Sequence, residues 1–196
     1  MFVDNANSLF IASFRGTNSN SELLTEGLHL KDVKYDLYSL NDARVTQFFY
    51  SAYKDYMRSD FLENFQDYTE QFSGYTIVIT GHSLGAAMAT HAALDVVLGG
   101  YADGDDILHY NYGSPRVGNY NFAQEVQKYV PTIFRIVHDK DPVPHIPGCK
   151  TALFHSECQE DATYSGQNDL IWPAWHIQPQ IFYNADSSSY KTCTAE

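Results

Sequence analysis

Apolar and polar residues alternate along the chain in blocks typical of an α/β protein. Residues 75–80 are apolar and rich in β-branched side chains, as in a buried strand, and residues 84–94 are small and apolar, as in a buried helix. The sequence Gly-His-Ser-Leu-Gly, residues 81–85, joins the two. A serine at such a junction is held on a tight turn that exposes its hydroxyl, and the glycines avoid collisions with the strand and the helix. The pattern predicts a nucleophile elbow that presents Ser83.

The same reasoning predicts elements on both sides of this junction. Further strands are expected at residues 8–14, 107–112 and 132–137. Apolar residues recur at helical spacing from Asn41 to Phe72, which predicts one long helix or two with a break near Ser59. Asn119 is expected to cap another helix, and residues 148–196 are expected to be irregular. The predicted fold class is therefore α/β, a mostly parallel sheet flanked by helices, with reactive groups in loops at the carboxyl ends of the strands.

Length and charge narrow the function. A chain of 196 residues fits a single domain, residues 1–196, with one active site. The net charge of −12 argues against nucleic acid as a partner and against electrostatic docking on anionic membranes. No apolar run approaches the length of a membrane span, and the first residues lack the pattern of a signal peptide. Neither C-x-x-C nor H-E-x-x-H occurs, so no metal or other cofactor is expected.

The three cysteines suggest a disulfide. Cys149 and Cys158 enclose a short polar loop and are candidates for a pair, which would leave Cys193 without a partner in this sequence or paired with a cysteine of a missing amino-terminal segment.

A serine nucleophile needs an imidazole base, and the imidazole needs a carboxylate that fixes its tautomer. In hydrolases of this kind the chain order is serine, acid, histidine. Asp141 is the favoured acid because it follows the strand expected at 132–137, and Asp139 is the alternative.

Three histidines follow these acids. His145 lies between two prolines, which limits its reach, and His155 lies in the candidate cysteine loop. His176 is favoured as the base because its loop is far enough along the chain to cross back over the strand ends. Packing between the neighbouring tryptophans is the alternative role for His176.

The oxyanion formed by nucleophilic attack needs donors that are already in place. One is the backbone N–H of Leu84, directly after the nucleophile, and the other is expected from the loop after the first strand, at Thr17.

Four motifs occur in a fixed order along the chain. They are Phe-Arg-Gly-Thr at 14–17, Thr-Gly-His-Ser-Leu-Gly at 80–85, Tyr-Gly-Ser-Pro-Arg-Val-Gly-Asn at 112–119, and Arg-Ile-Val-His at 135–138 leading to Asp-Pro-Val-Pro at 141–144. Together they resemble the fungal-type class 3 lipases of the α/β-hydrolase superfamily. The resemblance implies hydrolysis of acylglycerol esters, a triad of Ser83, Asp141 and His176, and oxyanion donors at Thr17 and Leu84.

Residues 21–28 fit one or two helical turns with Leu23, Leu24 and Leu28 on one face, and the resemblance implies that the segment after Thr17 is an interfacial lid. An ordinary surface helix is the alternative. A secreted monomer that acts on lipid or other esters at a lipid–water interface is expected.

Other activities remain compatible with the sequence. Feruloyl or short-chain esterases, a catalytically inactive lipid-binding relative and an acyltransferase are the alternatives. The chain also departs from the family pattern: Ala86 follows Gly85, residues 45–49 lack a histidine and a glycine, and no tryptophan follows the oxyanion loop. Family members carry a long segment before the first motif, so an amino-terminally truncated chain is expected.

Overall fold

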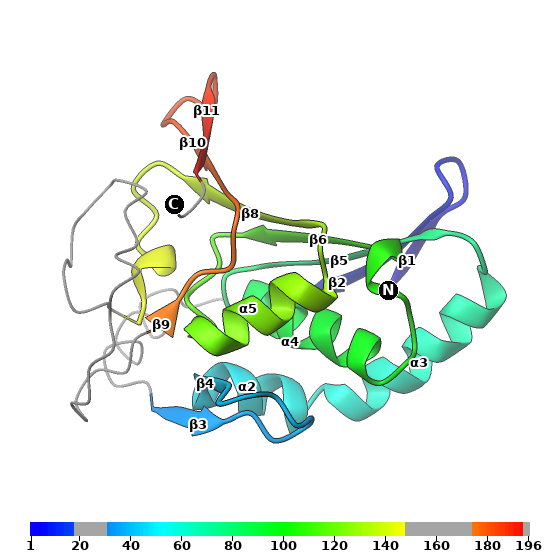
Figure 1. The fold of residues 1–196 in the computed structure, drawn as a ribbon. Coiled ribbons are helices and arrows are strands. Elements are labelled where there is room, and N and C mark those ends of the chain that lie inside the picture. Colours follow the sequence, from blue (N-terminus) through cyan, green and yellow to red (C-terminus); the bar gives the residue numbers. More distant parts are fainter. Residues whose placement is uncertain (18–30, 148–173, 194–196) are drawn as a thin grey trace.

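The computed structural model describes residues 1–17, 31–147 and 174–193. Within these ranges a seven-stranded sheet has the order β1-β2-β5-β6-β8-β10-β11 (Figure 1). Its strands are β1 (Phe2–Asp4), β2 (Leu9–Phe14), β5 (Thr76–His82), β6 (Ile107–Tyr112), β8 (Ile133–His138), β10 (Gln180–Tyr183) and β11 (Tyr190–Cys193). The strands from β2 to β10 are parallel, and β1 and β11 pair antiparallel at the two edges. The α/β fold class with a mostly parallel central sheet is confirmed.

A smaller antiparallel sheet has the order β3-β4-β7-β9. Its strands are β3 (Asp32–Lys34), β4 (Arg44–Thr46), β7 (Gly118–Asn119) and β9 (Ala174–Trp175). This sheet brings together segments far apart in sequence, because Gly118 pairs with both Val45 and Trp175.

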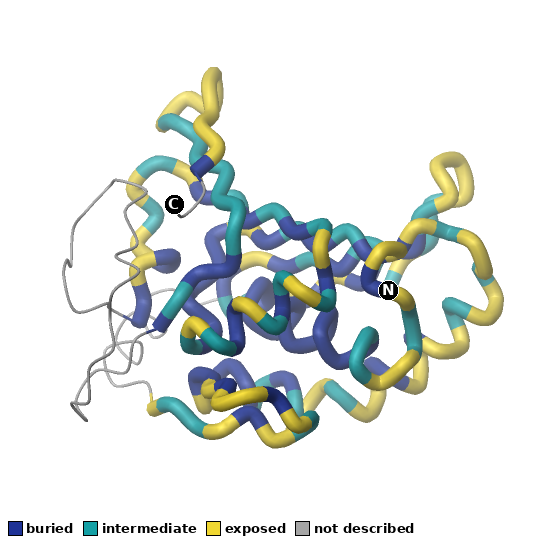
Figure 2. The backbone as a smooth tube through the Cα atoms, in the orientation of Figure 1, coloured by how far each residue is buried: buried dark blue, intermediate teal, exposed yellow. Residues whose placement is uncertain are grey.

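The described helices are α2 (Gln47–Lys54), α3 (Arg58–Gln71), α4 (Leu84–Leu98) and α5 (Tyr120–Tyr129), with short 3₁₀ turns η1 (Gly104–Asp106) and η2 (Val143–His145). Helix α4 packs against β2, β5 and β6 on one side and against α2 and α5 elsewhere, so it is buried almost all round (Figures 1 and 2). Its small apolar side chains permit this close packing, as the sequence predicted. The predicted cap is also present: the Asn119 side chain accepts a hydrogen bond from the N–H of Phe122 at 3.0 Å.

Polar groups on α4 join it to its neighbours. The Asp95 carboxylate is fully buried and accepts hydrogen bonds from Arg58 at 2.7 and 3.1 Å and from the hydroxyls of Tyr38 and Tyr53, each at 2.7 Å. Because a buried carboxylate is costly without partners, these contacts fix α2, α3 and α4 relative to one another.

Two predicted boundaries are wrong. Residues 44–46 form strand β4 rather than the start of a helix, and the helical region divides at 55–57 instead of near Ser59. Val45 is buried because it faces the interior from a strand.

The prediction that residues 148–196 are irregular is wrong for the described part of this range, because β9, β10 and β11 lie between residues 174 and 193. The expected pairing of the cysteines is also wrong. Cys193 is buried and disulfide-bonded, so it is not the odd cysteine. The other two cysteines of the sequence, Cys149 and Cys158, lie outside the described residues.

Candidate active site

Ser83 lies on the turn between the end of β5 and the start of α4. Its backbone has φ 57° and ψ −126°, a conformation that is strained for a residue with a side chain. Two hydrogen bonds hold the turn: the Ser83 N–H donates to the carbonyl of Tyr112, and the N–H of Ala86 donates to the carbonyl of Ser83, both at 3.0 Å. The elbow geometry expected from Gly-His-Ser-Leu-Gly is thus present.

Two glycines of the motif permit a very close backbone approach. A Cβ on Gly81 would lie 2.2 Å from the carbonyl oxygen of Gly85, and a Cβ on Gly85 would lie 2.2 Å from the carbonyl oxygen of Phe14. No side chain fits at such distances. The start of α4 is therefore pressed against β5 and against the end of β2.

The loop after β2 lies beside the serine. A Cβ on Gly16 would lie 2.5 Å from the carbonyl oxygen of His82 and 3.4 Å from the Cβ of Ser83. Leu84 is the first residue of α4, where backbone N–H groups have no acceptor within the helix. Thr17 directly follows Gly16, and the role of Thr17 and Leu84 as oxyanion donors stays a prediction. The lid candidates Leu23, Leu24 and Leu28 lie outside the described residues.

Asp141 lies in the loop that follows β8. Ser83 follows β5, so both residues lie at the carboxyl ends of the parallel strands. One carboxylate oxygen, Oδ1, accepts the N–H of Val143 at 3.0 Å. The other, Oδ2, is 2.5 Å from the position of a Cβ on Gly113, which directly follows β6 and has φ 54°. This glycine, part of the motif at 112–119, leaves space for the carboxylate.

Asp139, the alternative acid, has φ 41° and donates its backbone N–H to Tyr183 at the end of β10, at 2.8 Å. The Asp139 backbone is thus bonded to β10, whereas the Asp141 carboxylate lies next to Gly113 at the end of β6.

His176 is buried, and its Nε2 atom lies 2.7 Å from the carbonyl oxygen of Pro144. Because a carbonyl can only accept, Nε2 carries the hydrogen. Burial lowers the pKa of His176 well below its ordinary value, and the nearby charges of Arg135 and Arg116 lower it further. The His176 ring is therefore neutral, and its Nε2–H donates to the carbonyl of Pro144 in η2.

No hydrogen bond joins Ser83, Asp141 and His176 in the described part of the chain, and the triad stays a prediction. Among the described residues, the Ser83 hydroxyl oxygen is buried without a hydrogen-bond partner, and no histidine ring is hydrogen-bonded to Asp141. His176 precedes β10, whereas Ser83 and Asp141 follow the carboxyl ends of their strands. The alternative base His145 is half-buried; burial lowers its pKa, Arg116 lowers it further and Asp141 opposes the change. His155 lies outside the described residues.

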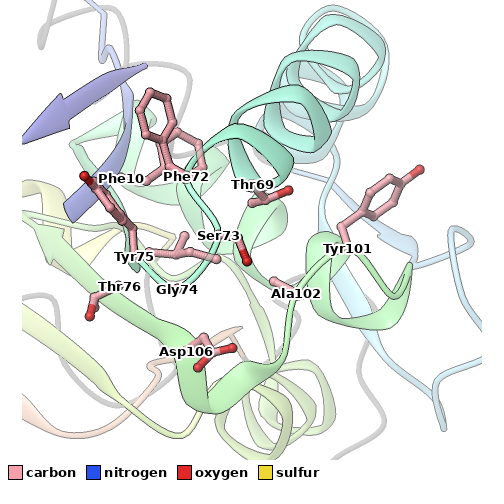
Figure 3. Close-up of a pocket in the computed structure, with 11 residues that line it drawn as sticks. Phe10, Thr69, Phe72, Ser73, Gly74, Tyr75, Thr76, Tyr101, Ala102 and Asp106 are labelled. Carbon is pink, nitrogen blue, oxygen red and sulfur yellow. The ribbon is translucent and has the colours of Figure 1, made fainter. Parts of the chain in front are cut away.

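The cavity in Figure 3 belongs to another part of the molecule. It has a volume of about 240 Å³ and is lined by residues such as Phe72, Tyr75, Tyr101 and Asp106. Thr76, the first residue of β5, lines it, while Ser83 follows the last residue of that strand. The cavity therefore lies at the amino ends of the parallel strands, whereas the candidate site lies at their carboxyl ends.

Neither a metal site nor a membrane span is present in the part of the chain that the structure describes. Residues 1–17, 31–147 and 174–193 contain no group of three potential metal-ligating side chains, and no helix there is long and apolar enough to cross a bilayer.

Comparison with known proteins reveals close sequence relatives. The chain is 35% identical over 145 residues to a lipase of Caenorhabditis elegans, an alignment that covers 73% of this chain and 39% of that protein. It is 34% identical over 154 residues to secreted mono- and diacylglycerol lipase A of Penicillium cyclopium, covering 78% and 48%. The chain therefore spans less than half the length of these relatives.

Solved structures share the fold. Rhizomucor miehei triacylglyceride lipase superposes with a TM-score of 0.79 and 23% identity, covering 98% of this chain and 64% of that chain. At this identity the likeness concerns the fold alone, which is that of the α/β-hydrolases.

The family model described as Lipase (class 3) matches residues 11–151, most of the chain. This segment includes most of β2, the Ser83 elbow and the Asp141 loop. The chain therefore belongs to the class 3 lipase family.

Proposed function

We propose that this chain carries the core of a serine hydrolase that cleaves carboxylic esters of acylglycerols. The strained Ser83 elbow is the observation on which the proposal rests, because it holds a serine on the turn between β5 and α4, next to the loop that follows β2. The substrate class is supported by the mono- and diacylglycerol lipase of Penicillium cyclopium, which is similar over most of this chain.

In this reaction the Ser83 oxygen bonds to the ester carbonyl carbon, the alcohol leaves, and water then releases the acid from the acyl-enzyme. The N–H groups of Leu84 and Thr17 stabilise the oxyanion, and Asp141 orients the imidazole that accepts the serine proton. The sequence analysis predicts that His176 supplies this imidazole.

The test is labelling with a fluorophosphonate, combined with hydrolysis of emulsified diacylglycerol and of a dissolved short-chain ester. The wild type should be labelled at Ser83 and hydrolyse the emulsion, and Ser83→Ala should lose both properties. Asp141→Asn should lower kcat by roughly 10⁴, while Asp139→Asn should be mild. Labelling at another residue, or the reverse ranking of the two aspartates, would contradict these assignments.

A catalytically inactive lipid-binding relative is the second candidate. It is favoured by the absence of a hydrogen-bond partner for the Ser83 hydroxyl among the described residues. Binding of diacylglycerol vesicles without hydrolysis or labelling would support it. Cleavage of feruloyl esters in preference to acylglycerols would instead support an aromatic esterase.

The cellular setting is part of the same proposal. A secreted protein that acts at a lipid–water interface fits both the secreted relatives and a disulfide at Cys193.

The lid proposal predicts that replacing Leu23, Leu24 and Leu28 with serine reduces activity on an emulsion much more than on a dissolved ester. Equal losses would exclude an interfacial lid.

A further inference from the structure

Behind the elbow lies a small network of buried polar side chains. Thr90 of α4 and His109 of β6 are fully buried, and Asn111 of β6 is 1% exposed. His109 and Asn111 are two positions apart on one strand, so they share a face of the sheet, and their contacts with Thr90 show that this face meets α4.

The hydrogen atoms of this network can be assigned from its partners. His109 Nδ1 lies 2.9 Å from the carbonyl oxygen of Ile79, so Nδ1 carries a hydrogen. Burial lowers the pKa of His109 to about 4, so the ring is neutral and Nε2 accepts. The Asn111 amide nitrogen then donates one hydrogen to His109 Nε2 at 2.9 Å and the other to the Thr90 hydroxyl at 3.0 Å.

The chain of bonds ends on the first turn of α4. The Thr90 hydroxyl donates to the carbonyl oxygen of Ala86 at 3.0 Å, and the Ala86 N–H donates to Ser83. At its other end the network belongs to β6, where Asn111 is in register with Gly81 and the next residue, Tyr112, accepts the Ser83 N–H. Strand β6 therefore pairs with the end of β5 and also accepts the N–H of Ser83.

This arrangement differs from ordinary packing of a helix on a sheet. Apolar contacts are not directional, whereas a chain of buried hydrogen bonds fixes the rotation and depth of the helix against the strand. The remaining Asn111 oxygen, Oδ1, has no partner among the described residues, so the side chain is held by its two donor bonds. This buried oxygen without a partner lowers stability, so the Asn111 amide is not explained by stability alone.

We propose that Thr90, His109 and Asn111 are positioning residues, which hold the first turn of α4 so that Ser83 and the N–H of Leu84 face one reacting carbonyl. This inference rests on the proposed function for its catalytic consequence. The geometric part, the seating of the first helical turn, does not depend on activity.

The test is Thr90→Val, which keeps the shape of the side chain and removes the hydroxyl, with Thr90→Ser as the variant that restores it. Hydrogen exchange of the Ala86 and Ala87 amides, which donate to the Ser83 carbonyl at 3.0 and 3.3 Å, reports on the first turn. In Thr90→Val this exchange should accelerate roughly tenfold, as expected for loss of a hydrogen bond, and kcat should fall with little change in KM. Thr90→Ser should return both values toward the wild type.

Val96→Ala is the matched control, because Val96 is a fully buried residue on the same helix without a part in the network. It should lower the melting temperature while leaving kcat and the relative exchange of Ala86 and Ala87 unchanged. The proposal would be overturned if Thr90→Val left both amide exchange and kcat unchanged. It would also be overturned if exchange in Thr90→Val accelerated across the whole chain, as in the Val96→Ala control, and not mainly at Ala86 and Ala87. A wild type that shows neither labelling nor hydrolysis would defeat the proposed function, while the exchange measurement would still decide the positioning role.

Discussion

Gly113 and Asp141 meet where the ends of β6 and β8 lie side by side. A Cβ on Gly113 would come within 2.5 Å of the Asp141 carboxylate, and the positive φ of 54° adds strain for any other residue. We predict that Gly113→Ala displaces this carboxylate and lowers kcat by roughly tenfold to a hundredfold, as misplacement of a catalytic group does.

Gly100→Ala is the control for the strain. Gly100 also has a positive φ, of 75°, but nothing lies within 4 Å of its Cβ position. Both variants should be destabilised, and steady-state kinetics should show a loss of kcat in Gly113→Ala alone. Equal kcat values would mean that Asp141 adapts or has no part in the reaction.

The role of His176 is decided by a glutamine substitution. Glutamine retains a donor near the Nε2 position, so His176→Gln should keep the hydrogen bond to Pro144, the melting temperature and kcat within about tenfold of the wild type. A general base cannot be replaced in this way, because an amide does not take up a proton. A loss of roughly 10⁴ in kcat with an unchanged melting temperature would instead establish His176 as the base.

The sequence predicts some site residues better than others for a physical reason. Ser83 and its glycines are identified by local geometry, since a strand, a tight turn and a helix follow one another within a few residues. Asp141 follows a strong strand pattern. His176 depends on a long-range crossing, and the strands around it have only two and four residues, too few to show alternation.

At the scale of elements, α4 carries a histidine that titrates unusually. Both ring nitrogens of His91 are buried without hydrogen-bond partners among the described residues, and the ring packs between aromatic side chains. These neighbours are Tyr35, Tyr50, Tyr53 and Phe122. Burial lowers the pKa of His91 to about 3, so it is neutral in the native state.

This histidine makes stability depend on pH. An unfolded histidine takes up a proton below about pH 6.5, which the buried ring does not, so the unfolded state is favoured as pH falls from 6.5 toward 3. Between pH 7 and pH 5, His91 should contribute a loss of about 2 kcal/mol. Melting curves of His91→Phe should show a weaker pH dependence than the wild type. Identical slopes for wild type and His91→Phe would show that the ring is protonated in the native protein.

The elements themselves were predicted where periodicity is strong. Strands β2, β5, β6 and β8 and helices α4 and α5 follow from apolar runs and a cap, because burial on a packed sheet requires those patterns. The start of the helical region was misplaced because Val45 is apolar in a strand at a position that also fits helical spacing. Strands β1, β10 and β11 lie at or near the sheet edges, where burial is partial and the sequence carries little pattern.

For the whole molecule, the disulfide at Cys193 closes a long loop at the edge of the sheet. Cys193 ends β11, which pairs with β10, and the candidate partners for its disulfide are Cys149 and Cys158, earlier in the sequence. Cross-linking such a loop stabilises a domain by roughly 3 to 4 kcal/mol, chiefly by restricting the unfolded chain. Because the edge strands contribute few buried contacts of their own, they should separate first once this link is broken.

We therefore predict that reduction lowers the melting temperature of the wild type by several degrees, and that Cys193→Ser has the same lower value with or without reductant. Of Cys149→Ser and Cys158→Ser, one should match Cys193→Ser because it removes the true partner, and the other should behave like the wild type. Peptide mapping under non-reducing conditions should recover Cys193 joined to that same partner. A peptide that links Cys149 to Cys158, together with a free Cys193 thiol, would contradict the disulfide and remove the expected effect of the reductant on β10 and β11.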